Sequence, residues 1–478
     1  MPFSVLLRLF ASLWITYLFH FQPLAQGSDR LVFLVQAIAE QSTFALDDYT
    51  VLLPPDQGLV YRDHLYSDLN PGMALLAMPL WWIVQLFYRI LPETAAIRDA
   101  QFHYVLSHAV ATLSTTSVLT ALTGCGLALV VYHKTQQQWR SLLAAFLYGG
   151  GSIACFFATH LNPNTAIAAV VLGIYLCLFT PQLLGLNEPQ RRSAVLGALL
   201  GFGVLIDTTM LPMVWVTALF WFVQYRDRWQ DLLWVILGAI VPLALLFYYQ
   251  LACFGQPLIT TAGILVAQTQ GGTNPITWQT LLGLPLNLLV YQPYGLLTLL
   301  YLAVFWRRSH PLSILEKNFL VVTTVVMIGG VIYLLKLGAI PSDLLLERFG
   351  PQLLIPLLPL WCLVVALYCP RRLNGMALTL IGLGFWFNFV GIQQGIVPDE
   401  HVFRSSIMAL PRLPAFPWFT WLKIVRSSLF GVELAGVQAG FFFMAWLVLL
   451  AVIWLPLGRG QSPFSVRRAQ SPSGRVRR

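Results

Sequence analysis

The stretch GMALLAMPLWWIVQLFYRI, residues 72–90, decides the membrane topology of this chain. It is apolar, but it is shorter than the roughly 20 residues that a helix needs to cross a bilayer. Pro79 and Gln85 interrupt it, and it carries Trp81 and Tyr88, which favour the interface between membrane and water. We therefore expect this segment to lie along a membrane surface rather than to cross it.

The composition indicates a multi-pass membrane protein. Of the 478 residues, 58% are hydrophobic and 10% are charged, and a water-soluble globule cannot bury that much apolar surface. Residues 4–25 have a long aromatic core that contains Arg8, which favours an uncleaved first span over a secretory signal. The six cysteines lie in or beside apolar runs without metal-type spacing, so we interpret them as packing residues.

Basic residues mark the cytoplasmic side, because short cytoplasmic loops of membrane proteins are rich in Lys and Arg. The markers are Lys134 and Arg140, Arg191 and Arg192, Arg226 and Arg228, Arg307, Arg308 and Lys317, Arg371 and Arg372, and the tail from Arg459. If residues 72–90 crossed the membrane, Lys134 and Arg140 would lie outside. The sequence therefore predicts an all-α integral membrane fold with about twelve transmembrane helices and both termini in the cytoplasm.

This topology divides the chain into one polytopic domain, residues 1–458, and a basic cytoplasmic tail, residues 459–478, that can touch anionic lipid. Residues 23–106 become one large external loop with juxtamembrane helices. Two short apolar segments between residues 193 and 224 are predicted to be half-buried helices that meet at a turn near Asp207.

The external loop concentrates the acid of the protein. It holds nine of the 19 carboxylates and four arginines. Leu31, Leu34 and Val35 recur at helical spacing, so a short helix is predicted to lie on the membrane, with Asp29 in its first turn, where the helix dipole favours a carboxylate. Asp29 is either a catalytic group at the boundary between lipid and water or a helix cap that pairs with Arg30.

Other polar residues of the loop are candidates for substrate contacts. Asp63, His64, Tyr66 and Asp68 could bind a divalent cation, hydrogen-bond sugar hydroxyls or assist proton transfer, or they are solvated loop residues. Asp47 and Asp48 are secondary candidates for substrate or metal binding. Glu40 is expected to face water.

Several motifs resemble the GT-C superfamily of polyprenyl-phosphate-dependent glycosyltransferases, which includes lipid A aminoarabinose transferases and protein O-mannosyltransferases. The motifs are Asp-Arg-Leu-x(6)-Ile-Ala-Glu from Asp29, STFALDDY, LYSDLNPGMALLAMPLW, LYGGGSIACFFATHLNPNTAIAAVVLGIYL, YYQLACFGQPLITT and ERFGPQLLIPLLPLW. The resemblance implies that Asp29 is catalytic, that Tyr66 and Asp68 open an interfacial helix at the site, and that His160, Asn162 and Asn164 face it.

The chain departs from the family pattern at two places. It has Asp29-Arg30 where many relatives have an acidic pair, and Leu69 where they have a Lys that is expected to meet the donor phosphate. Another cation must then serve the phosphate. The candidates are Arg62, Lys336 and Arg348. An arginine could bind a phosphate with two hydrogen bonds. Alternatively, the side chains of Lys336 and Arg348 extend to the lipid head groups.

The leading hypothesis is an inverting glycosyltransferase of the bacterial inner membrane and cell envelope. The implied partners are a polyprenyl-phosphate-linked sugar donor, a lipid, protein or glycan acceptor, and membrane lipids. The basic residues cluster in short loops and the tail, which points to topology and not to nucleic acid. No nucleotide cofactor is expected without a Gly-rich phosphate loop; a divalent cation is possible. The alternatives are a transporter or flippase for a lipid-linked sugar precursor, and a noncatalytic scaffold.

Overall fold

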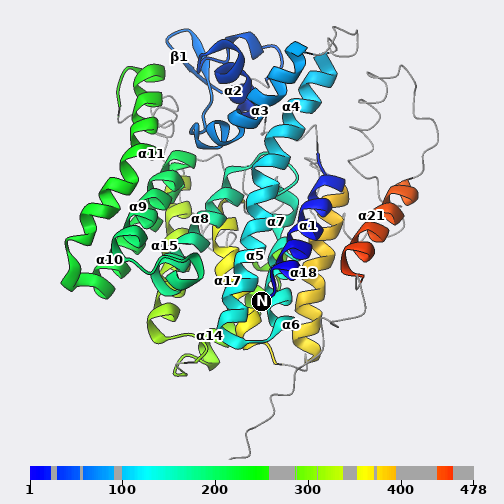
Figure 1. Ribbon diagram of the computed structural model, residues 1–478, viewed down its shortest axis with the longest axis vertical. Coiled ribbons are helices and arrows are strands. Elements are labelled where there is room, and N and C mark those ends of the chain that lie inside the picture. The colour runs from blue at the N-terminus through cyan, green and yellow to red at the C-terminus, as the bar shows by residue number, and fades with distance from the viewer. Residues whose placement is uncertain are drawn as a thin grey trace, which may run out of the picture.

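The computed structural model is almost entirely helical (Figure 1). It describes residues 1–22, 29–53, 58–90, 100–257, 286, 288–308, 310–336, 352–370, 374–394 and 439–455. A group of elements at one end of the molecule forms what we call the cap. It consists of α2 (Asp29–Gln36), η1 (Ala37–Gln41), η2 (Asp47–Tyr49), the hairpin of β1 (Leu59–Tyr61) and β2 (His64–Tyr66), and α3 (Gly72–Ile90). The cap belongs to the external loop predicted over residues 23–106.

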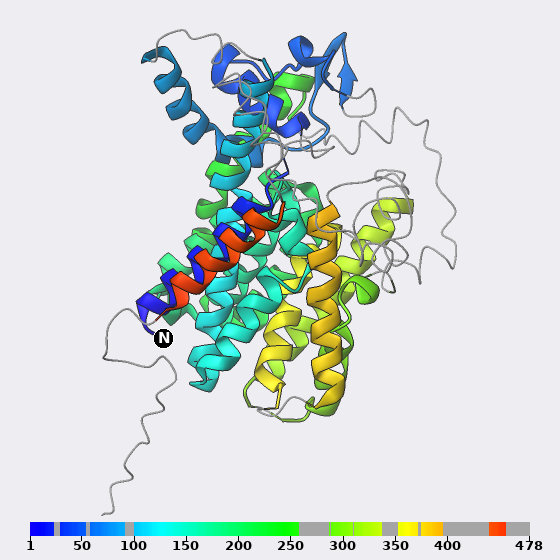
Figure 2. The same cartoon turned by 90° about the vertical axis from the view of Figure 1, so that its right-hand side faces the viewer.

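The remaining helices form a bundle below the cap (Figures 1 and 2). They are α1 (Phe3–Phe19), α4 (Ala100–Ser114), α5 (Thr116–Thr135), α6 (Gln138–Gly149), α7 (Ile153–Phe157), α8 (Pro163–Phe179), η3 (Pro181–Leu184), α9 (Pro189–Ile206), η4 (Thr208–Met210), α10 (Leu211–Tyr225), η5 (Arg226–Arg228), α11 (Asp231–Phe254), α14 (Gly295–Val304), α15 (Ile314–Lys336), η6 (Gln352–Leu357), α17 (Leu358–Tyr368), α18 (Gly375–Gln394) and α21 (Ala439–Trp454). One hydrophobic core joins the cap and the bundle, because buried residues of α2 and α3 belong to the same cluster as those of α5, α8 and α17.

Four helical segments of the described chain are long and apolar enough to cross a membrane, and they are Phe102–Thr135, Asp231–Phe254, Ile314–Tyr333 and Gly375–Ile392. Shorter apolar helices of 10–17 residues accompany them. This confirms a helical protein with several membrane-length segments, while twelve spans stays a prediction. The first of these segments combines α4 and α5, which are separated by a break at Thr115.

Two sequence predictions for the bundle are confirmed. The turn near Asp207 exists: α9 ends at Ile206, and the Asp207 carboxylate caps η4 by accepting a hydrogen bond of 2.8 Å from the Thr209 amide. All six cysteines are buried and free, as expected of packing residues. Helix α9 also packs closely on α11, since Gly197 faces the Val235 backbone with no room for a side chain.

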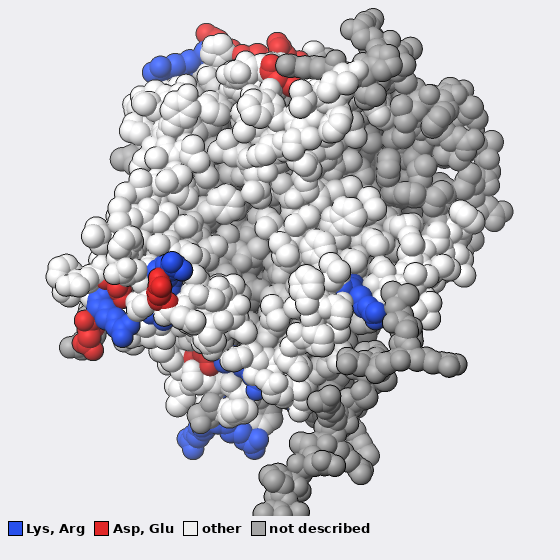
Figure 3. Space-filling model, viewed as in Figure 1, with Lys and Arg blue, Asp and Glu red and all other residues white. Residues whose placement is uncertain are grey.

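Charged side chains gather at the two ends of the molecule. Figure 3 shows acidic side chains over the cap, and basic side chains at the lower end and along the lower flank, some beside acidic ones. At the lower end, Glu316 accepts hydrogen bonds of 2.6 Å from Lys134 and from the Tyr175 hydroxyl, which joins α15 to α5 and α8. Lys317 is fully buried beside it and donates to backbone carbonyls of residues 305, 306 and 308. This distribution has the polarity that the basic loops predicted.

The structure corrects one expectation about the cap. Helix α2 was expected to rest its apolar side chains on the membrane, but Leu31, Leu34 and Val35 are buried inside the protein, where α2 packs on α3 and α4. Helical spacing identifies an apolar face without telling whether lipid or protein covers it. On α3, by contrast, an exposed apolar stripe remains as an interfacial helix requires, and Figure 2 shows this helix leaning out from the bundle. The stripe consists of Leu76, Leu80, Ile83, Phe87 and Ile90.

Candidate active site

Asp29 lies in the first turn of α2, at the boundary between the cap and the bundle, where it contacts α4. Only 8% of the residue is exposed, which is unusual for a carboxylate because burial of a charge costs free energy unless it is paired. Ser28, the residue before this helix, lies outside the described residues. The position in the first turn confirms the sequence prediction.

Two residues of α4 hold the Asp29 carboxylate. The Tyr104 hydroxyl donates a hydrogen bond of 2.5 Å to Asp29 Oδ1, and His108 Nε2 lies 3.2 Å from the same oxygen. The tyrosine and histidine rings pack against each other with centroids 4.4 Å apart. Sequence reasoning missed both residues, although Tyr104, His108 and Thr112 recur every four residues in an apolar run and so form a polar face.

Arg30 does not pair with Asp29, so the part of this alternative that paired the two residues is wrong. Its Nη1 atom donates to Asp68 Oδ2 over 2.5 Å. Adjacent residues of a helix point in different directions, about 100° apart, and thus Asp29 turns toward α4 while Arg30 turns toward the loop before α3. The pairing ties Asp68 to α2, and no arginine of the described residues is paired with the Asp29 carboxylate.

The loop that carries Asp68 is fixed on the end of α9. The Asn70 side-chain amide donates a hydrogen bond of 3.0 Å to the Val204 carbonyl. Two residues later, Gly72 lies against the α9 backbone, where an added Cβ would be 2.6 Å from the Leu205 carbonyl oxygen and 2.7 Å from Ile206 Cα. The start of α3, and with it Asp68, is therefore located by backbone contacts.

The residues predicted on the hairpin form a separate cluster at the surface of the cap. Asp47 accepts hydrogen bonds from His64 Nδ1, at 2.7 Å, and from the Leu65 amide, at 2.8 Å. Partial burial opposes ionisation of Asp47, but these bonds outweigh it and lower the pKa of the carboxyl below its ordinary value. Asp48 accepts from the Gln41 side chain over 3.0 Å.

Arg62 and Asp63 form the tip of the hairpin, with φ of 48° and 67°. Both are exposed, and the Arg62 guanidinium lies 5.2 Å from the Tyr61 ring. Tyr66 is buried on the end of α11, with its ring centroid 5.6 Å from that of Phe254. No hydrogen bond or ion pair within the described part of the chain joins the hairpin residues to Asp29.

The predicted turn between α7 and α8 lies farther into the bundle. His160 is buried between Phe156 and Phe157. Asn162 caps α8, with its side-chain oxygen 2.9 Å from the Asn164 amide, and its side-chain nitrogen donates to Gln352 over 3.1 Å.

This turn is tied to the helix that carries His108. The Asn162 amide donates to the Thr116 hydroxyl over 3.3 Å, and Thr116 follows His108 by eight residues, about 12 Å of helix. His160 and Asn162 thus lie below Asp29 along the same long segment of α4 and α5.

Two predicted cations cannot be placed. Lys336 is the last residue of α15, but its side chain lies outside the described residues, and so does Arg348. The described residues also contain no group of three or more His, Cys, Asp or Glu side chains that could hold a metal ion.

Glu40 keeps contact with water and also joins three elements of the cap and bundle. Its Oε1 atom accepts hydrogen bonds from Trp81, at 2.9 Å, and from Gln85, at 3.0 Å, and lies 3.7 Å from His103 Nε2. Glu40 therefore holds η1, α3 and α4 together, a structural role that its sequence position did not reveal.

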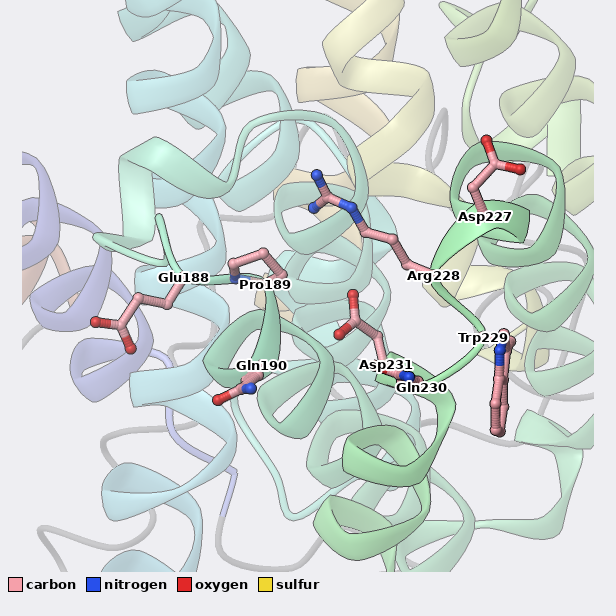
Figure 4. Close-up of a pocket in the computed structure, with 8 residues that line it drawn as sticks. All are labelled: Glu188, Pro189, Gln190, Asp227, Arg228, Trp229, Gln230 and Asp231. Carbon is pink, nitrogen blue, oxygen red and sulfur yellow. The ribbon is translucent and has the colours of Figure 1, made fainter.

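Two cavities lie apart from Asp29. One of about 500 Å³ is at the lower end, between the starts of α9 and α11, where the Arg228 and Asp231 side chains extend into the same space (Figure 4). The other, of about 520 Å³, is a largely apolar groove between α1, α6, α18 and α21. Neither is lined by Asp29 or by the residues that hold it.

The comparisons with known proteins give one structural likeness. No family model matches the sequence, and no curated protein matches it. The fold is similar to that of the crystal structure of ArnT from Cupriavidus metallidurans bound to undecaprenyl phosphate, with a TM-score of 0.48, 12% sequence identity, and coverage of 94% of this chain and 70% of that one.

Proposed function

We propose that this protein is a glycosyltransferase that moves a sugar from a polyprenyl-phosphate donor to an acceptor on the external face of a membrane, with inversion at the anomeric carbon. The observation that carries the proposal is the Asp29 carboxylate. It is nearly buried at the boundary between cap and bundle, hydrogen-bonded by Tyr104, and paired with no arginine in the described part of the chain. The sequence motifs around Asp29 and Asp68 support the same assignment.

Asp29 acts as the general base in this proposal. The acceptor hydroxyl loses its proton to the carboxylate as its oxygen attacks the anomeric carbon, and the bond from that carbon to the donor phosphate breaks. The electron pair of that bond leaves on the polyprenyl phosphate. A carboxylate paired with an arginine would be a weaker base, so the turn of Arg30 toward Asp68 favours this role for Asp29.

The developing charge on the phosphate needs a cation. Arg30 is occupied by Asp68, whereas Arg62 is exposed on the hairpin, so we propose Arg62 with Lys336 and Arg348 as the phosphate contacts. Asp47, Asp48, Asp63, His64, Tyr66, Asp68, His160 and Asn162 are proposed to contact substrate. The cap faces the periplasm and both termini face the cytoplasm, in keeping with the concentration of acid at one end and of base at the other.

The test is sugar transfer by Asp29→Asn in proteoliposomes that contain total bacterial lipid. The donors are tritium-labelled undecaprenyl-phosphate pentoses and hexoses, and the readout is loss of the donor. We expect the rate to fall by about 10²- to 10⁴-fold, the usual contribution of a general base. Asp227→Asn, an exchange in η5 at the other end of the bundle, serves as the matched control and should retain wild-type activity. Transfer by Asp29→Asn near the wild-type rate would overturn the assignment.

The same proteoliposomes separate the enzyme from a flippase. A flippase moves the intact labelled donor between leaflets, so donor in the inner leaflet becomes accessible to added reagents without loss of its sugar. Such movement without consumption of any donor would contradict glycosyl transfer.

A further inference from the structure

His108 is a buried titratable group that has no role in the reaction proposed above. It lies on the polar face of α4, one turn after Tyr104 and one turn before Thr112. Only 1% of His108 is exposed, and Thr112 is fully buried with no hydrogen-bond partner for its hydroxyl among the described residues. The Asp29 carboxylate therefore faces a second proton-binding group that is shielded from bulk water.

The contact between His108 and Asp29 depends on whether the imidazole nitrogen carries a proton. His108 Nε2 is 3.2 Å from Asp29 Oδ1, within ion-pair distance, yet it is not aligned as a hydrogen bond. A neutral imidazole that carries its hydrogen on Nδ1 presents the Nε2 lone pair to the carboxylate oxygen, and the two repel each other in this water-poor site. The contact is favourable once a proton resides on the nitrogen, so the geometry suits a pair that gains a proton during its working cycle.

We propose that His108 is the second member of the base, and that it receives the proton that Asp29 removes from the acceptor hydroxyl. This inference rests on the glycosyl transfer proposed above. The acceptor O–H bond breaks, the oxygen bonds to the anomeric carbon, and the phosphate leaves with its electron pair. The proton passes from the Asp29 carboxyl to His108 Nε2, which leaves a carboxylate beside an imidazolium.

General acid–base chemistry gives this transfer its direction. An imidazole is in general a stronger base than a carboxylate, so the proton moves from the carboxyl to the imidazole. The resulting opposite charges attract each other more strongly in a buried site than in water. The transfer restores the carboxylate, and the imidazolium then releases its proton to water before the next turnover.

The surroundings leave Asp29 as the charged partner of His108. Titratable groups on the elements packed against α4 at this end, as far as the chain is described, are Asp29 and Arg30 on α2, Glu40 on η1, Tyr88 on α3 and His20 after α1. Arg30 is paired with Asp68, and Glu40 is held by α3. His20 Nδ1 lies 2.7 Å from the carbonyl oxygen of Thr16 on its own helix.

The first test is the pH dependence of kcat and KM for donor consumption by His108→Gln and His108→Phe. Since His108 must be neutral to receive the proton, its removal should shift the acid limb of the kcat profile to lower pH. We also expect kcat to fall by about 10²-fold with little change in KM. His133→Gln, at the far end of the same long helical segment, is the matched control and should keep the wild-type profile. Variants that fold and keep the wild-type profile would overturn the proposal.

The second test needs no substrate. In protein labelled with ¹⁵N-histidine, the His108 signal is identified among the eight histidines by its loss in His108→Gln. In Asp29→Asn the His108 ring loses its contact with the carboxylate, so the ¹⁵N chemical shifts of its ring nitrogens at neutral pH should change. Unchanged shifts refute the pair. Loss of transfer in Asp29→Asn with a wild-type profile in His108→Gln would refute the pair and leave the transferase intact. Changed shifts with no donor consumed by the wild type would refute the transferase and with it the proposed proton transfer.

Discussion

Replacement of Gly72 by Ala tests whether backbone packing at the start of α3 positions the site. An added Cβ would lie 2.6 Å from the Leu205 carbonyl oxygen and 2.7 Å from Ile206 Cα. An ordinary contact needs at least 3.4 Å, so α3 must move away from α9 by about 0.8 Å, the difference between 3.4 Å and 2.6 Å. Both obstacles are backbone atoms, which cannot rotate aside as a side chain can.

The movement reaches the candidate site through Asp68, four residues before Gly72. Asp68 is paired with Arg30, which directly follows Asp29 in α2. A misplacement of about 1 Å can cost about 10²-fold in rate, so we expect a loss of sugar transfer of that order. The overpacking itself should cost about 1–3 kcal/mol of the free energy of unfolding.

The assay compares transfer rates and thermal unfolding in detergent for Gly72→Ala and Gly329→Ala. An added Cβ at Gly329, inside α15, meets nothing within 4 Å, so Gly329→Ala should keep its activity and its stability. Wild-type transfer by Gly72→Ala would refute the argument that α9 sets the position of Asp68. Global unfolding of Gly72→Ala is distinguished by its thermal transition, and the smaller movement is then sought with Asn70→Ala, which removes the hydrogen bond to Val204.

Three further outcomes follow from the structure. Lys134→Met should lower the free energy of unfolding by about 3–5 kcal/mol, because it leaves the buried Glu316 without its cationic partner. Glu316→Gln in the same chain should restore part of this loss, which a double-mutant cycle in detergent can measure. The ionised form of Asp47 is stabilised in the folded cap, so its contribution is present at neutral pH and lost as the pH falls through its lowered pKa. The protection factors of the hairpin amides, the exchange rates corrected for the intrinsic effect of pH, should therefore fall in acid, and Asp47→Asn should abolish that dependence. Cysteines introduced at Val51, 93% exposed, and at Trp229, 73% exposed, should react with an impermeant maleimide from the periplasm and from the cytoplasm, respectively. The six native cysteines are buried and should not react. Labelling of both positions from one side would contradict the topology.

Local sequence patterns predicted the parts of the site that depend on neighbouring residues. The start of α2 at Asp29 and the turn at Asp207 were both found, because caps and helix ends are set by a few adjacent residues. The basic loops likewise predicted which end of the bundle is positively charged.

Contacts between distant residues could not be predicted in this way. Tyr104 follows Asp29 by 75 residues, and its polar face was hidden inside a long apolar segment. The partner of Arg30 was missed for the same reason, since Asp68 lies 38 residues away and only the packing of α3 brings it near. The burial of α2 was missed because lipid and protein select the same apolar side chains.

The break at Thr115 has a consequence for access to the site. It separates α4, which carries Tyr104 and His108, from α5, whose far end is anchored by Lys134. A rotation of α4 by about 5° about this hinge would move Tyr104, eleven residues or about 16 Å away, by about 1.4 Å. Helix α2 packs on α3 as well as on α4, so the cap must follow α4 if the carboxylate, the tyrosine and the histidine are to keep their mutual distances while a lipid-linked molecule enters.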